Sequence, residues 1–95
     1  HDDIDKSLEE FCLLDSYPNP FNSSTTFSFQ VKKESVASLD IFDLLGRRIA
    51  VLVDGELRPG RYNIPWDARS CASGSYTCRL ELNGKVNLRR VLLLK

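Results

Sequence analysis

The stretch Tyr76–Leu88, with the sequence YTCRLELNGKVNL, decides the fold of this 95-residue chain. Apolar residues occupy every second position before the central Asn83-Gly84 pair, which is the pattern of a half-buried β-strand. An Asn-Gly pair between two such runs is the strongest short-range indication of a two-residue β-hairpin. The stretch therefore predicts two antiparallel strands joined by a tight turn.

The same period of two recurs along most of the chain. Further sets with this period are Phe27/Phe29/Val31, Ala37/Leu39/Ile41, Ile49/Val51/Val53 and Tyr62/Ile64/Trp66. Glycine and proline punctuate the connections between them, and no segment has a helical period of 3.6. Short strands with one apolar face must bury that face against another layer. We predict an all-β fold, an immunoglobulin-like or fibronectin III-like antiparallel β-sandwich of about seven strands.

The last strand, Val86 to Lys95, is rich in leucine up to its final residues. One interpretation is an ordinary core strand; the other is a strand whose ordered end is itself used for recognition, because ordering a terminus costs backbone entropy. Both interpretations can hold together. The apolar pattern then predicts that Val86, Leu88, Leu92 and Leu94 pack inward, while Arg89, Val91, Leu93 and Lys95 lie outside.

Charge divides the chain unevenly although its formal net charge is zero. Residues 1–16 carry six acids and one base, and residues 17–95 carry seven acids and twelve bases. We expect residues 1–10 to be a flexible acidic linker from a preceding domain, and residues 11–95 to be one domain. No run of 18 apolar residues and no signal-peptide pattern is present. The few bases near the end lack an aromatic platform, so nucleic-acid binding is not supported.

Residues suited to catalysis or metal binding are scarce. The single histidine is His1, so no histidine-based acid, base or triad is available within the fold, and enzyme activity is not expected. Cys12, Cys71 and Cys78 do not have the spacing of a zinc site, and we assign no metal or cofactor. A Cys71–Cys78 disulfide is conceivable, but a buried free thiol at Cys78 is favoured, since this residue has the phase of the core.

The segment from Tyr17 to Asn22 contains two prolines, which remove backbone donors and disfavour helix. In an extended chain the side chains of Tyr17, Asn19 and Phe21 would point the same way. We therefore expect the two aromatic rings to cover one end or edge of a sheet.

Five motifs occur in a fixed order. They are Tyr17-Pro18-Asn19-Pro20-Phe21-Asn22; Leu39 to Arg47, with Asp43 and Gly46; Trp66-Asp67-Ala68; Ala72-Ser73-Gly74-Ser75-Tyr76 with Arg79-Leu80; and Arg90-Val91-Leu92-Leu93-Leu94-Lys95. Together they resemble the type A C-terminal sorting domain of the type IX secretion system, from about Phe11 to Lys95. The related immunoglobulin-like domain of flagellar hook-capping proteins shares part of this pattern.

The resemblance implies a non-catalytic module that directs an attached N-terminal cargo through the outer-membrane translocon of a two-membraned bacterium, by way of the periplasm. A surface sortase-like peptidase would remove the module within residues 1–16, and the cargo would then be joined to anionic lipopolysaccharide. The protein would thus be secreted or held at the outer-membrane surface. The recognition residues implied by the resemblance are Arg90, Leu92, Leu93, Leu94 and Lys95.

Four positions depart from the family pattern. Phe42 replaces the usual Tyr, Cys71 a common Leu, Cys78 a common aromatic residue, and Arg90 a frequent Lys. The alternative function is a structural or adhesive module, either a spacer or a carbohydrate binder. That alternative predicts an open concave face or an exposed pair of aromatic rings.

Overall fold

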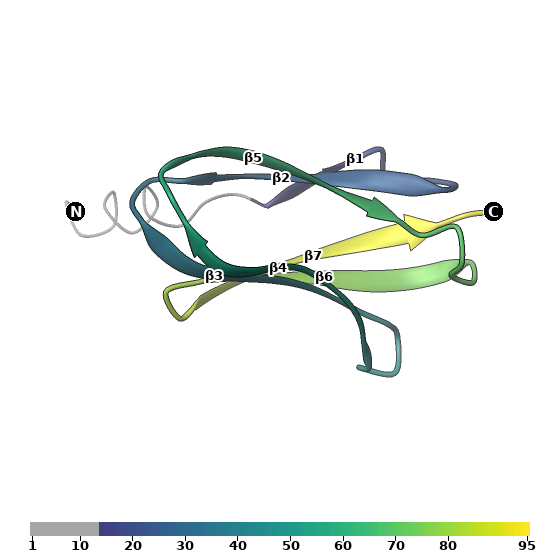
Figure 1. Cartoon of the computed structure of the whole chain (residues 1–95). Helices are drawn as coiled ribbons and strands as arrows, with labels where there is room; N and C mark the ends of the chain where they lie inside the picture. Colours follow the sequence, from purple (N-terminus) through teal and green to yellow (C-terminus); the bar gives the residue numbers. More distant parts are fainter. Residues whose placement is uncertain (1–13) are drawn as a thin grey trace, which may run out of the picture.

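A computed structural model of the chain describes residues 14–95, which form seven strands and no helix (Figure 1). The strands are β1 (Asp15–Tyr17), β2 (Ser24–Val31), β3 (Ser35–Phe42), β4 (Arg48–Leu57), β5 (Gly60–Asp67), β6 (Gly74–Leu82) and β7 (Lys85–Leu93). Three parts of the sequence predictions lie outside the described residues: the linker at residues 1–10, the start of the domain at Phe11, and Cys12. Nothing between Leu14 and Lys95 forms a helix that could cross a bilayer.

Two antiparallel sheets face each other across the core (Figure 1). One sheet has the strand order β1-β2-β5 and the other β4-β3-β6-β7. The chain changes sheet after β2, after β4 and after β5, as in Greek-key sandwiches. The predicted immunoglobulin-like β-sandwich is therefore confirmed. Pro65, which has no amide hydrogen to donate to a neighbouring strand, lies in β5, an edge strand of the three-stranded sheet.

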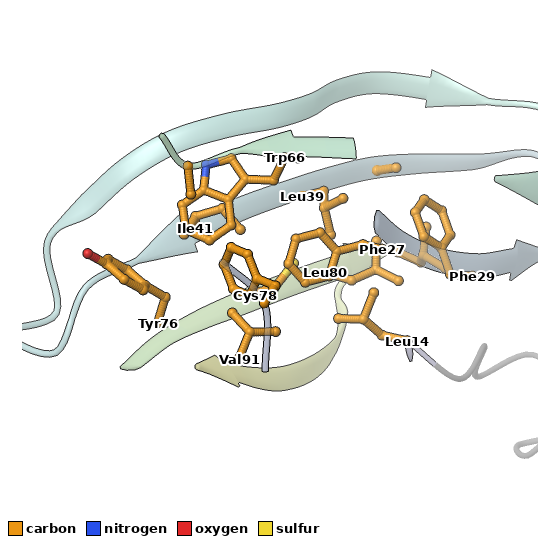
Figure 2. Packing of buried hydrophobic residues seen from close by; sticks show 14 of the residues in the cluster. Leu14, Phe27, Phe29, Leu39, Ile41, Trp66, Tyr76, Cys78, Leu80 and Val91 are labelled. Carbon is orange, nitrogen blue, oxygen red and sulfur yellow. The ribbon is translucent and has the colours of Figure 1, made fainter. Parts of the chain in front are cut away.

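The inward faces of β2, β3, β5 and β6 form a continuous core (Figure 2). The predicted alternation holds on these four strands: Phe27, Leu39, Ile41 and Leu80 are fully or almost fully buried, and Trp66 is also buried. Cys71 and Cys78 are free thiols, and Cys78 is completely buried, as the free-thiol interpretation expected. Burial raises the pKa of the Cys78 thiol far above its usual value, because the thiolate would lose its hydration.

Strand β4 departs from its predicted face. The sequence pattern placed Ile49, Val51 and Val53 inward, but Ile49 and Val51 are exposed. The register between β3 and β4 shifts twice, between Leu39/Asp40 and between Ile41/Phe42. Each β-bulge inserts a residue and changes which side chains face the core. As a result Ala50 and Leu52 pack against the core in place of Ile49 and Val51, while Val53 packs against the core as predicted.

Strand β7 also has the opposite phase to the prediction. Val91 is 1% and Leu93 0% exposed, whereas Leu88 is 60% and Leu94 53% exposed. The tight turn explains the reversal, because Asn83 and Gly84 have φ values of 50° and 86° and place Leu82 opposite Lys85. Directly paired residues share a face of the sheet, so the odd-numbered residues of β7 follow the inward residues of β6. The inward prediction for Val86, Leu88, Leu92 and Leu94 is therefore wrong.

The segment between β1 and β2 does not continue as an extended strand. Strand β1 ends at Tyr17, and the peptide bonds before Pro18 and Pro20 are both cis. Tyr17 is 81% exposed while Phe21 is buried, so the two rings do not lie on one side. The prediction that both rings cover the sheet is wrong for Tyr17 and confirmed for Phe21.

Candidate functional site: the C-terminal strand and the segment that holds it

Strand β7 forms one edge of the four-stranded sheet, and its C-terminal half is covered on the outer edge by Phe21. Phe21 and Leu93 form a parallel β-bridge. The Phe21 amide donates to the Leu92 carbonyl at 3.0 Å, and the Leu94 amide donates to the Phe21 carbonyl at 2.8 Å. The motif segment from Tyr17 to Asn22 thus contacts the last strand, although about 70 residues of sequence lie between them.

Asn19 adds a second pair of hydrogen bonds to the same strand. Its side-chain Nδ2 donates to the Arg90 carbonyl at 3.1 Å, and its Oδ1 accepts the Leu92 amide at 3.1 Å. Thr25 supports this segment, since its hydroxyl donates to the Pro18 carbonyl at 2.7 Å. No pattern in the sequence indicated that Asn19 would contact the last strand.

Three aromatic rings from separate motifs pack together beneath this edge. The Phe21 and Trp66 ring centroids lie 5.7 Å apart, and the Trp66 and Tyr76 centroids 5.4 Å apart in an edge-to-face arrangement. Figure 2 shows Trp66 and Tyr76 within the core cluster. The Tyr76 hydroxyl donates to the Ala72 carbonyl at 2.5 Å. Tyr76 therefore anchors the loop before β6, much as a tyrosine corner does in related sandwiches.

Asp43, Gly46 and Arg47 build the turn between β3 and β4. Asp43 Oδ1 accepts the Leu45 and Arg47 amides, and its Oδ2 accepts Arg47 Nε at 2.7 Å. Gly46 has a φ of 83°, which a glycine adopts without steric cost. The hydrogen bond from the Arg47 amide is the main cause that holds the pKa of Asp43 below its usual value. These three motif positions shape the turn.

Asp67 and Arg69 order the loop that receives the C-terminal residue. Arg69 Nη2 lies 2.7 Å from Asp67 Oδ2, and the side-chain hydrogen bonds from Arg69 lower the pKa of Asp67. The Arg69 carbonyl accepts Lys95 Nζ at 2.6 Å, and Ser73 Oγ accepts the Lys95 amide at 3.0 Å. The last residue of the chain is therefore held against the loop between β5 and β6.

The outward face of β7 is a row of mainly apolar side chains. We call Val86, Leu88, Arg90 and Leu92 of β7, together with Leu94 just beyond its end, the outer row; Leu92 is half-buried and the other four are exposed. A shallow depression of about 380 Å³ lies at its C-terminal end, lined by Pro18, Pro20, Phe21, Asn22 and Leu94. A monomeric domain has no packing reason to align exposed leucines along one strand.

The predicted recognition residues thus fall into two groups. Arg90, Leu92 and Leu94 belong to the outer row and Lys95 is exposed beside it, whereas Leu93 is a core residue. The apolar pattern did not predict that Val91 is a core residue or that Leu88 is exposed. Pairing residues across the two-residue Asn83-Gly84 turn, instead of following the apolar residues, would have found both.

Other kinds of site find little support among residues 14–95. No group of three His, Cys, Asp or Glu side chains in this range is placed to hold a metal ion. Tyr17 is the one aromatic side chain of this range that is mostly exposed, so the exposed aromatic pair expected of a carbohydrate binder does not form here. The features that stand out are the outer row and the contacts that fix the strand carrying it.

These features define a class: an immunoglobulin-like sandwich whose last strand is tied to the domain by an early motif. Residues 15–94 match the family described as "Secretion system C-terminal sorting domain". The chain belongs to this family, which confirms the resemblance stated above, and it is a C-terminal secretion signal module. Its family implies a destination at the cell surface or outside the cell.

Two solved structures resemble the domain. One is PorZ of Porphyromonas gingivalis, described as an essential bacterial surface component of the type-IX secretion system, with 22% identity and a TM-score of 0.55. The match covers 86% of this chain but 11% of PorZ, so the chain corresponds to a small part of that protein, and the similarity is one of fold. The other is the Ig1 domain of mouse SynCAM 2, with 16% identity and a TM-score of 0.47. That match covers 88% of this chain and 93% of the SynCAM 2 chain. No curated protein sequence matches the chain.

Proposed function

We propose that the domain is a non-catalytic sorting module whose outer row is read by the outer-membrane translocon of the type IX system. The observation that carries the proposal is the exposure of Leu88 and Arg90 on β7, and of Leu94 just beyond its end, while the intervening Val91 and Leu93 are completely buried. The core residues fix the strand, so the outer row keeps one geometry. A rigid apolar row with a basic residue suits a partner surface that is apolar with an acidic group.

The route and the processing complete the proposal. A cargo at the N-terminus enters the periplasm, crosses the outer membrane with the module, and is separated from it by a surface sortase-like peptidase that cuts within residues 1–16. Anionic lipopolysaccharide is then a partner of the cargo alone. Support comes from the family and from the acidic, unpatterned composition of residues 1–10, which is typical of a chain accessible to proteases.

The decisive experiment changes the outer row and leaves the core intact. Deleting Val91 to Lys95 would remove two core residues and unfold the domain, so it cannot separate recognition from folding. Instead, all 95 residues are fused behind a periplasmic reporter in a host with this system, and Arg90, Leu92 and Leu94 are each changed to Ser. We expect the reporter to reach the surface with the unchanged chain and to remain in the periplasm with the triple variant.

The matched control is Val36→Ser, which replaces an exposed apolar side chain on β3 at the Asn83-Gly84 end of the sheet, opposite to the end that carries Arg90, Leu92 and Leu94. Circular dichroism and a urea titration establish that both variants fold. If the folded triple variant is exported as well as the Val36→Ser variant, the outer row is not the recognition surface.

A further inference from the structure

Strand β7 is an edge strand, and edge strands present unpaired amide and carbonyl groups to other chains. The motif segment from Asn19 to Phe21 takes up this edge over Arg90 to Leu94. The same residues that carry the C-terminal part of the outer row are therefore the ones whose backbone edge is already occupied.

The hydrogen bonds between this segment and β7 follow the pattern of a parallel β-ladder. In a parallel ladder, Phe21 exchanges bonds with the Leu92 carbonyl and the Leu94 amide, and the residue two positions earlier should bond the Arg90 carbonyl and the Leu92 amide. That residue is Asn19, and its side-chain amide makes both of these bonds in place of its backbone. Because a side-chain amide carries a donor and an acceptor like a peptide group, asparagine can fill this position.

Prolines flank Asn19 on both sides, at Pro18 and Pro20. Neither has an amide hydrogen, and in this register neither would bond to β7, because only Asn19 and Phe21 face that strand. The prolines therefore leave no unpaired amide hydrogen on the side of the segment that faces away from β7. The side chain of Asn19 thus extends the parallel ladder by one step where the backbone does not.

We infer that Asn19 is a positioning residue for the sorting signal: its side chain completes the ladder that holds Arg90 to Leu94, and so fixes the outer row and closes this edge to pairing with another chain. The inference rests on the proposed function for its role in export. Recognition then reads the side chains of the outer row rather than adding a strand to β7. The Tyr-Pro-Asn-Pro-Phe-Asn motif, which is exposed except for Phe21, acts by holding the recognition strand.

Amide hydrogen exchange on the full 95-residue chain tests the contact directly. Loss of a hydrogen bond of ordinary strength corresponds to about a tenfold change in local opening, so we expect the Leu92 amide to exchange about tenfold faster in Asn19→Ala. Amides in the centre of β6 should keep their rates. Asn19→Asp retains the acceptor for the Leu92 amide and loses the donor to Arg90, so it should keep more of the Leu92 protection than Asn19→Ala.

Asn22→Ala is the matched control, because Asn22 belongs to the same motif and is exposed without a hydrogen bond to residues 14–95. It should leave the Leu92 amide unchanged. Equal Leu92 exchange in the unchanged chain and in Asn19→Ala would overturn the inference, whatever the export result. Where Asn19→Ala does not fold, Asn19→Asp and Asn22→Ala are compared, and the inference fails if they show the same exchange.

Export separates positioning from general stability. Ser28→Ala removes a hydrogen bond of 2.7 Å between Ser28 on β2 and Asn63 on β5, two neighbouring strands of the sheet that does not contain β7. We expect reporter export to fall at least about threefold in Asn19→Ala and to stay unchanged in Ser28→Ala at a similar urea midpoint. Equal losses in both variants would contradict a positioning role. Failure of the unchanged chain to export would instead reject the proposed function, while the exchange result would still decide whether the contact exists.

Discussion

At the scale of single residues, the two described cysteines differ in how deeply their side chains are buried. Cys78 is completely buried between β3 and the facing sheet, and its pKa is raised by burial and then by the charge of Asp40. Cys71 is half-buried at the margin of the core. Since the thiolate is the reactive form, Cys78 can react only when the domain opens.

We therefore predict that iodoacetamide labels Cys71 and leaves Cys78 unmodified in the folded protein. The experiment uses the Cys12→Ser variant, so that two thiols remain, and mass spectrometry follows the labelling. Cys78 should react at least about a hundredfold more slowly than Cys71, because its reaction requires unfolding. Denaturant should abolish the difference. Similar native rates would show that the core around Cys78 opens far more easily than its packing implies.

At the scale of the element, the sequence predicts that β7 is a strand, but it does not predict which of its side chains face the core. Its existence follows from the apolar run and the Asn83-Gly84 turn, and both are visible in the sequence. The facing depends on register, which the two-residue turn fixes by pairing Leu82 with Lys85. Both faces of the C-terminal half carry leucine, so the apolar pattern could not choose between them.

The register gives a direct prediction for two adjacent leucines. Leu93→Ala should lower the free energy of unfolding by about 2–5 kcal/mol, because it leaves a cavity in the core. Leu94→Ala should change it by less than about 0.5 kcal/mol, since that side chain is exposed and its backbone bond to Phe21 survives. Urea titrations of both variants provide the measurement. Equal losses would mean that both leucines are packed.

Two further features could not be predicted from the sequence: which side chains of β4 face the core, and the contact that the Tyr17–Asn22 segment makes with the last strand. The bulges of β4 arise from its pairing with β3, which is a long-range effect. No glycine or proline at Ile49 or Val51 marks their positions in the sequence. The motif around Asn19 could be predicted to be non-helical from its prolines. Its contact with the last strand could not, because it depends on two segments that meet only in the folded sandwich.

At the scale of the whole molecule, two exposed loops rely on ionised carboxylates. Asp43 holds the β3–β4 turn and Asp67 holds the β5–β6 loop that contacts Lys95, and both have pKa values below the ordinary 3.8 of an aspartate. A carboxyl group whose pKa is lower in the folded state stabilises the fold above its unfolded pKa. That contribution disappears as the pH falls through the folded-state value.

We therefore predict that the difference in free energy of unfolding between the unchanged chain and the Asp43→Asn/Asp67→Asn double variant becomes smaller as the pH falls. The unchanged chain should be more stable at about pH 6, and the difference should narrow as the pH drops below about 4. Urea titrations across this range provide the measurement. Asp54→Asn is the matched control, because Asp54 is exposed on β4 and has no hydrogen bond or ion pair with residues 14–95. A difference that stays constant down to about pH 2 would show that the stability of the two loops does not depend on the charge of Asp43 and Asp67.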